Sequence, residues 1–113
     1  MSLRPVLIVE EGPDKGKNYS SDSVQIKVGR GKAAADFVLS GVDTSVSRVH
    51  FAVIRRGDTF VLTNLSANGT TVNGVKTPQA LLNDNDLIKI GLLTVIRFRL
   101  EDIAAMEANP SYR

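Results

Sequence analysis

Residues 49–74 read VHFAVIRRGDTFVLTNLSANGTTVNG, in which two short apolar runs are separated by turn-forming residues. Side chains at alternate positions of an extended run point to opposite faces, so Val49, Phe51 and Val53 are expected to share one face. Residues 55–58, RRGD, stand between this run and the next one, at 59–65, and are best read as a hairpin loop. The segment therefore predicts antiparallel β-structure.

Two Asn-Gly pairs, Asn68-Gly69 and Asn73-Gly74, follow within the same segment. A two-residue hairpin turn needs positive φ at both residues, which an Asn-Gly pair adopts readily. Asn73-Gly74 stands between two short β-type dipeptides and fits such a turn. Asn68-Gly69 comes soon after a predicted strand, so we expect it on a loop, where the amide side chain could bind a peptide backbone.

Runs of the β type recur along the chain about every 8–12 residues, with no helical period between them, which favours a β-sandwich or a small barrel. The expected runs are Val6–Glu10, Val24–Val28, Phe37–Leu39, Val49–Ile54, Thr59–Leu65, Leu87–Ile90 and Thr94–Leu100. The sequence EDIAAMEAN at 101–109 is the one helical candidate. We place one all-β domain at residues 4–100 and a C-terminal tail or short helix, from which a linker could begin, at residues 101–113.

The composition excludes several classes of function. The chain has 113 residues, 42% of them hydrophobic and 23% charged, as in an ordinary globular domain. It contains no cysteine, which excludes a disulfide scaffold and a thiol nucleophile, and His50 is its only histidine, which argues against a zinc site. We expect no metal, no cofactor and, without a signal peptide or an apolar span, a cytoplasmic location.

Two functional alternatives were weighed on particular residues. Ser47 and His50 suggest a hydrolase, but side chains three positions apart on a strand leave opposite faces, and no G-x-S-x-G sequence is present. We therefore expect no enzymatic activity. Arginines could indicate nucleic-acid binding, but a net charge of +2 is small and these side chains fit the wet faces of strands and a hairpin tip. The arginines concerned are Arg55, Arg56, Arg97 and Arg99.

An ordered series of short motifs resembles a forkhead-associated (FHA) domain, over roughly residues 6 to 100. The motifs are Gly29-Arg30, Asp36-Phe37-Val38-Leu39, Ser47-Arg48-Val49-His50, Asn64-Leu65-Ser66-Ala67-Asn68-Gly69-Thr70, Val72-Asn73-Gly74 and Leu87-Ile88-Lys89-Ile90-Gly91. The resemblance implies a β-sandwich of about eleven strands with the binding loops at one end. It also implies a non-catalytic module that recognises phosphothreonine peptides in kinase-dependent signalling.

The resemblance assigns roles to individual residues. It implies that Arg30, Ser47 and Arg48 bind the phosphate and that Asn68 binds the main chain of the peptide. Gly29, His50, Gly69, Asn73 and Gly74 would support the binding loops, and Ser45 and Thr71 are candidates for selectivity. The partner would be a phosphothreonine-containing protein, a Ser/Thr kinase or its substrate, with no nucleic acid or membrane involved. Physical chemistry agrees, because an arginine fork contacts two phosphate oxygens at once.

Three positions depart from the family pattern. Ala67 stands where many members have a Thr or Ser hydroxyl that helps to hold the phosphate, and Asn64 replaces a frequent Asp. Asp43 adds a negative charge that would oppose phosphate if it pointed into the site. Ala67 and Asp43 leave open an alternative, in which the domain is a phosphate-independent scaffold for protein interactions.

Overall fold

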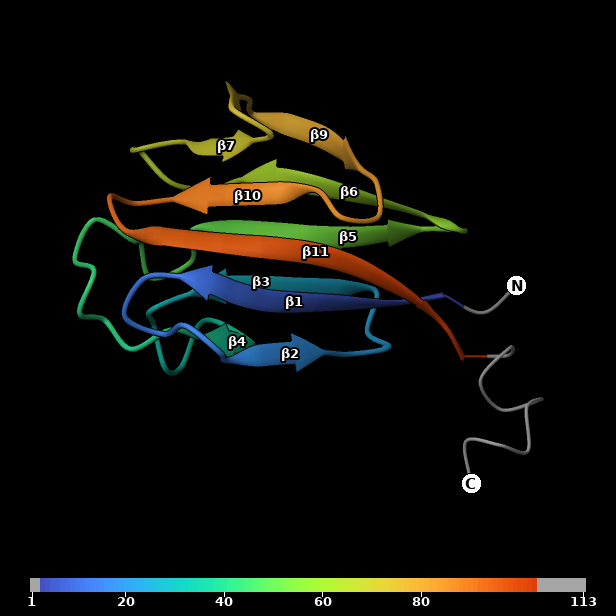
Figure 1. Cartoon of the computed structure of the whole chain (residues 1–113), viewed down its shortest axis with the longest axis horizontal. Helices are drawn as coiled ribbons and strands as arrows, with labels where there is room; N and C mark the ends of the chain where they lie inside the picture. Colours follow the sequence, from blue (N-terminus) through green and yellow to red (C-terminus); the bar gives the residue numbers. More distant parts are fainter. Residues whose placement is uncertain (1–2, 104–113) are drawn as a thin grey trace.

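The computed structural model describes residues 3–103, and eleven strands in this range form two sheets that pack face to face (Figure 1). In spatial order, the first sheet contains β2 (Asn18–Ser20), β1 (Leu3–Glu11), β11 (Thr94–Asp102), β10 (Leu87–Ile90), β7 (Thr70–Val72) and β8 (Val75–Lys76). The second contains β4 (Phe37–Val38), β3 (Gln25–Gly29), β5 (Phe51–Arg56), β6 (Thr59–Asn64) and β9 (Gln79–Leu82). The predicted β-sandwich is confirmed.

Alternation along the strands places the core between the two sheets. Phe60 of β6 and Phe98 of β11 are buried from opposite sheets, and their ring centroids lie 5.8 Å apart. Strand β5 differs from the simple pattern, because Phe51, Ala52 and Val53 are all buried. Ala52 is a small residue paired between Lys27 of β3 and Thr63 of β6, whose longer side chains share its face and cover it.

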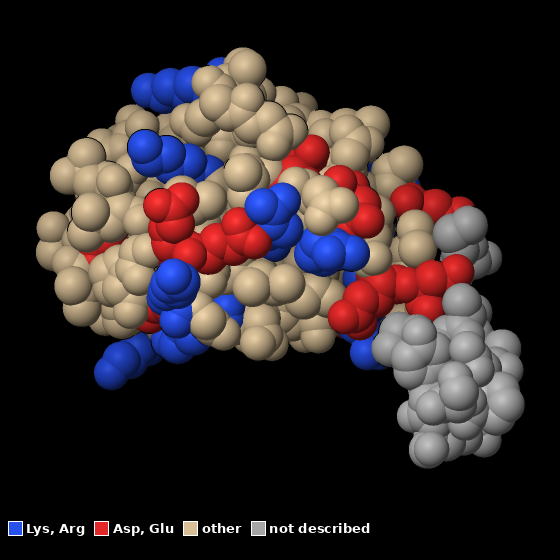
Figure 2. Space-filling model, viewed as in Figure 1, with Lys and Arg blue, Asp and Glu red and all other residues tan. Residues whose placement is uncertain are grey.

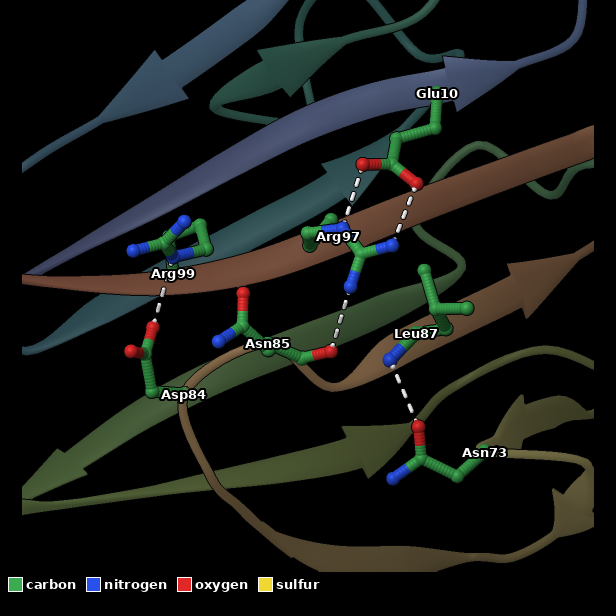
Figure 3. Close-up of polar contacts among 7 residues, drawn as sticks. All are labelled: Glu10, Asn73, Asp84, Asn85, Leu87, Arg97 and Arg99. Carbon is green, nitrogen blue, oxygen red and sulfur yellow. Dashed lines mark hydrogen bonds and ion pairs between the residues drawn. The ribbon is translucent and has the colours of Figure 1, made fainter.

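Both predicted hairpin turns are present. Gly57, with φ of 64°, turns β5 into β6, which pair in register from Arg56 opposite Thr59. Asn73 and Gly74 have φ of 50° and 84° and join β7 to β8 as a two-residue turn. Asn73 also accepts a hydrogen bond from the Leu87 N–H through Oδ1, which ties this turn to β10 (Figure 3).

Most of the expected strands differ from the observed ones by one to three residues at an end, and two errors at element ends have a structural reason. The strand expected from Val49 begins at Phe51. The residues before it form a bend, in which the carbonyls of Ser47 and Arg48 accept hydrogen bonds from the N–H groups of the loop after β3. The helix expected from Glu101 does not begin there, since Glu101 and Asp102 continue β11 in register with Arg4 and Leu3. The remainder of that helical candidate lies outside the described residues.

β1 and β11 run along the sandwich, with the start of β1 and the end of β11 at one end and the long loops gathered at the other (Figure 1). On the outer face of the first sheet, Arg97 pairs with Glu10 and Arg99 pairs with Asp84 (Figure 3). Basic and acidic side chains lie side by side across this face of the molecule (Figure 2). No helix within residues 3–103 is long and apolar enough to cross a membrane.

Candidate functional site

Two loops are joined directly at the end of β3. The Arg30 N–H donates to the Ser47 carbonyl at 3.1 Å, and the Gly31 N–H donates to the Arg48 carbonyl at 3.0 Å. Gly29 permits this approach, because a Cβ at that position would lie 2.0 Å from the Arg48 carbonyl oxygen. A residue with a side chain would force the loops apart, so Gly29 positions both arginines.

Arg30 and Arg48 border the same hollow, which has a volume of about 400 Å³ and is also lined by Lys32. No acidic residue is among its lining residues. The Arg30 Nε–H donates to the Val46 carbonyl at 2.6 Å, which orients the guanidinium group. Arg30 and Arg48 are both exposed, and neither forms an ion pair within residues 3–103. The structure therefore brings together two arginines that are 18 positions apart in the sequence.

His50 is fully buried, and it hydrogen-bonds to both binding loops. Its Nδ1 accepts the Ser47 N–H at 3.0 Å, and its Nε2 lies 2.8 Å from the Gly69 carbonyl oxygen. Because Nδ1 accepts, the proton of the neutral ring is on Nε2, which donates to Gly69. Burial lowers the pKa of His50, and this effect exceeds the opposite influence of the Gly69 carbonyl and the Asp43 carboxylate.

This geometry corrects the argument against a Ser47–His50 catalytic pair. Ser47 lies in the bend before β5, so the alternation of a strand does not apply to it, and its backbone N–H rather than its hydroxyl contacts His50. Ser66 is a second serine near the ring, with Oγ 3.0 Å from His50 Nε2. Since Nε2 carries the proton, His50 has no free lone pair there with which to deprotonate Ser66.

A hydrogen-bonded cluster that motif reasoning missed shapes the loop between β6 and β7. Ser66 Oγ accepts the Gly69 N–H at 2.9 Å and donates to Asn64 Oδ1 at 2.9 Å. Thr70 Oγ1 also donates to Asn64 Oδ1, at 2.9 Å, and the Asn64 amide donates to the Ser66 carbonyl. Asn64, at the position of the frequent family Asp, therefore supports the loop. In the sequence, an Asn followed two positions later by a Ser was the only local sign of this cluster, because an Asn side chain often bonds the backbone two residues on.

Asn68 is exposed at the tip of that loop and bridges to its neighbour. Its Nδ2 donates to the Ser45 carbonyl at 3.0 Å. Because a carbonyl oxygen can only accept, the side-chain atom that faces it must be the amide nitrogen. Gly69 has φ of 86°, and a Cβ there would lie 2.3 Å from Cε of Lys76, so the Lys76 side chain lies over this glycine. Within residues 3–103 the second N–H of the Asn68 amide and its side-chain oxygen have no partner, so both can bind a ligand.

Asp43 does not point into the arginine hollow. It is buried and accepts hydrogen bonds from the Ser45 hydroxyl, from the Leu93 N–H at 3.0 Å and from the Thr94 hydroxyl at 3.2 Å. Burial alone raises the pKa of Asp43, but the hydrogen bonds from Ser45, Leu93 and Thr94 together hold it below its ordinary value. Asp43 thus fastens the Ser45 loop to the turn between β10 and β11.

The two selectivity candidates lie side by side with Asn68. Ser45 and Thr71 line a second hollow of about 400 Å³, together with Lys89 and Leu92. The Ser45 hydroxyl is already engaged, because it donates to Asp43 and accepts the Leu92 N–H at 2.8 Å. Among residues 3–103, no group of three His, Cys, Asp or Glu side chains is placed to hold a metal ion.

Known proteins share the sequence pattern and the fold of this chain. The family model described as the FHA domain matches residues 26–91. An FHA domain from a study of phosphothreonine-dependent FHA interactions is 32% identical, with a TM-score of 0.76 over 88% of this chain and 98% of that chain. The FhaA FHA domain, solved with the intracellular domain of Rv3910, is 33% identical, with a TM-score of 0.73 over 84% of this chain and 99% of that one.

A larger protein contains a similar domain. Mycobacterium tuberculosis EmbR, solved with a low-affinity phosphopeptide, is 26% identical, with a TM-score of 0.71 over 85% of this chain and 24% of EmbR. A search of curated protein sequences gave no significant match. The family model covers more than half of the chain, and the resemblance first drawn from short motifs is confirmed: this chain belongs to the FHA domain family.

Proposed function

We propose that this chain is a non-catalytic module that binds phosphothreonine peptides in kinase-dependent signalling, with a Ser/Thr kinase or its substrate as the partner. Membership of the FHA family supports this, as do the relatives solved with partners or studied for phosphothreonine dependence. The observation that carries the proposal is the hollow bordered by Arg30, Lys32 and Arg48, with no acid in its lining.

The chemistry of the hollow suits a phosphate monoester. A phosphothreonine carries a charge of about −1.5 to −2 at neutral pH and presents three acceptor oxygens. Val46 engages only the Nε–H of Arg30, so the terminal nitrogens are free to form a fork on two oxygens. Ser47 Oγ has no hydrogen-bond partner within residues 3–103 and would donate to a third oxygen.

Asn68 would hold the peptide main chain beside the phosphate. A primary amide has two N–H donors and one carbonyl acceptor, and Ser45 uses one donor. The second N–H and the carbonyl oxygen match the C=O and N–H of an extended peptide. His50 and Gly29 would act indirectly, by keeping the Asn68 loop and the arginine loops in register.

A phosphate-independent scaffold is the second candidate, and Ala67 is the observation that favours it. Ala67 is exposed and offers no hydroxyl to the phosphate. Asp43 no longer supports this alternative, because its carboxylate binds the β10–β11 turn. The scaffold predicts partner binding that survives both phosphatase treatment and Arg30→Ala.

The proposal is tested by fluorescence anisotropy with degenerate phosphothreonine, phosphoserine and unphosphorylated peptide pools. Hydrogen bonds to charged groups contribute about 1.5–3 kcal/mol, so Arg30→Ala should weaken phosphothreonine binding about 10- to 100-fold. The matched control is Arg56→Ala, which removes an exposed positive charge from the hairpin at the opposite end of the sandwich (Figure 1). Equal binding of the three pools, or equal behaviour of the two variants, would refute the proposal.

A further inference from the structure

A row of side chains crosses the outer face of the first sheet beside Asn68. Thr71 of β7 is directly opposite Lys76 of β8 on one side and Lys89 of β10 on the other, and Lys89 is opposite Val95 of β11. Directly paired residues of antiparallel strands present their side chains on the same face. The row therefore passes beside the proposed peptide site at β7 and crosses β10 to β11.

A groove follows this row. The hollow beside Asn68 shares Thr71, Lys89 and Leu92 with a neighbouring hollow of about 380 Å³, so the two adjoin at these residues. We call the second hollow the outer groove; its apolar lining is Leu87, Leu92, Leu93 and Val95. A peptide that extends across Thr71 from the site beside Asn68 would reach it next.

The outer groove has exposed apolar side chains on a backbone that is held in place. Leu92 and Leu93 are 79% and 55% exposed. Their N–H groups are bound by Ser45 Oγ and Asp43 respectively, so the backbone of the turn is fastened to the loop that forms the site. Burial of these leucines by a ligand would therefore cost side-chain conformational entropy but little backbone entropy.

Charge distinguishes the two ends of this sheet face. Arg97 and Arg99 are each neutralised by an acid (Figure 3), whereas Lys76 and Lys89 form no ion pair within residues 3–103. The Lys76 side chain extends over Gly69, whereas Lys89 lines both hollows that contain Thr71, so an anionic group placed over Thr71 would face Lys89. The one acid lining the outer groove is Glu11, which lies opposite Val95 on the side away from Lys89.

We propose that the outer groove binds a flank of the same phosphothreonine peptide, which carries an acidic residue over Thr71 and then an apolar residue among the groove leucines. This inference rests on the proposed function. The spacing follows from geometry: Thr71 and Val95 are two strand separations apart, about 10 Å, and an extended chain advances about 3.3–3.6 Å per residue. The apolar residue therefore comes about three positions beyond the acidic one.

The test compares three phosphothreonine peptides by anisotropy: a short core peptide, the core extended after the phosphothreonine with Glu-x-x-Leu, and the core extended before it with Leu-x-x-Glu. One extended peptide should bind about tenfold more tightly than the core, which corresponds to about 1.4 kcal/mol. Leu93→Ser should abolish the part of this gain that depends on the peptide leucine. The matched control is Leu81→Ser, which removes a leucine of similar exposure, 58%, from β9 of the other sheet.

The acidic position has its own readout. Replacing the peptide Glu with Gln should weaken binding to the wild-type chain, and this difference should vanish in Lys89→Ala. If the core binds and neither extension improves its affinity, the inference is refuted and the proposed function stands. A gain that persists in Leu93→Ser and Lys89→Ala also refutes it. If the core fails to bind, the proposed function fails and the inference fails with it.

Discussion

Replacement of Gly29 by alanine tests whether close contact between the two arginine loops builds the site. The new Cβ would lie 2.0 Å from the Arg48 carbonyl oxygen, 2.5 Å from its carbon and 2.8 Å from the Ser47 carbonyl oxygen. All three atoms are backbone, so no side chain can rotate away. The loops must separate by more than 1 Å to reach ordinary van der Waals contact, at about 3.4 Å.

That separation breaks two hydrogen bonds. They are the bonds from the N–H groups of Arg30 and Gly31 to the carbonyls of Ser47 and Arg48, and each contributes about 1 kcal/mol net. Overpacking adds about 1–3 kcal/mol. We therefore expect Gly29→Ala to lower the free energy of unfolding by about 3–5 kcal/mol, a large part of the 5–15 kcal/mol typical of a domain.

Urea unfolding followed by circular dichroism measures this change, and Gly31→Ala is the matched control. Gly31 lies on the same loop, and its nearest contact with an added Cβ would be the Arg48 Cβ at 3.0 Å, so the expected loss is about 1 kcal/mol. Neither glycine has a positive φ, so backbone strain does not separate the two variants. Equal stability of the two variants, or wild-type stability of Gly29→Ala, would refute the reasoning.

Three further predictions concern single residues around the site. Because burial holds the pKa of His50 below its ordinary 6.5, the unfolded chain binds this proton more readily, so stability should fall as the pH falls from about 6.5 to about 5, above the range in which the carboxylates titrate. This part of the slope in unfolding experiments should be absent in His50→Gln, and its persistence there would contradict the assignment. Asp43→Asn places an N–H donor against N–H and O–H groups in a buried site, so the free energy of unfolding should fall by about 2 kcal/mol in thermal unfolding experiments. The control Asp58→Asn changes an exposed residue and should cost almost nothing. Similar losses in the two variants would contradict the role of Asp43 in fastening the Ser45 loop to the β10–β11 turn. Ala67→Thr should tighten binding of a phosphothreonine peptide about threefold to tenfold, with no gain for the unphosphorylated peptide, and unchanged affinity would show that this position does not contact phosphate.

Local patterns were enough to predict most of the strands and both hairpin turns. Alternation of apolar residues has a period of two, which is visible within a single run, and Asn73-Gly74 and Gly57 carry backbone preferences of their own. Short strands such as β2 and β9 escaped because three or four residues give too little periodicity. The end of β11 was misassigned because pairing with β1 outweighs the weak helical propensity of Glu101 and Asp102.

The candidate site was likewise predicted in part from the sequence and in part misjudged. The sequence by itself determined which residue types are available: two arginines, a serine and an asparagine on segments that follow strands, in an order that resembles an FHA domain. It misjudged Ser47 and His50, because their contact depends on a bend whose hydrogen bonds come from other loops.

Only the tertiary structure decided which of these groups meet. It turned Asp43 away from the arginines, placed Ser66 against His50, and aligned Lys76, Thr71 and Lys89 from three strands in one row. Such contacts depend on the register between strands that are distant in the chain, and register is set by the packing of the whole core. A local pattern in the sequence carries the period of a strand but not the identity of its neighbours.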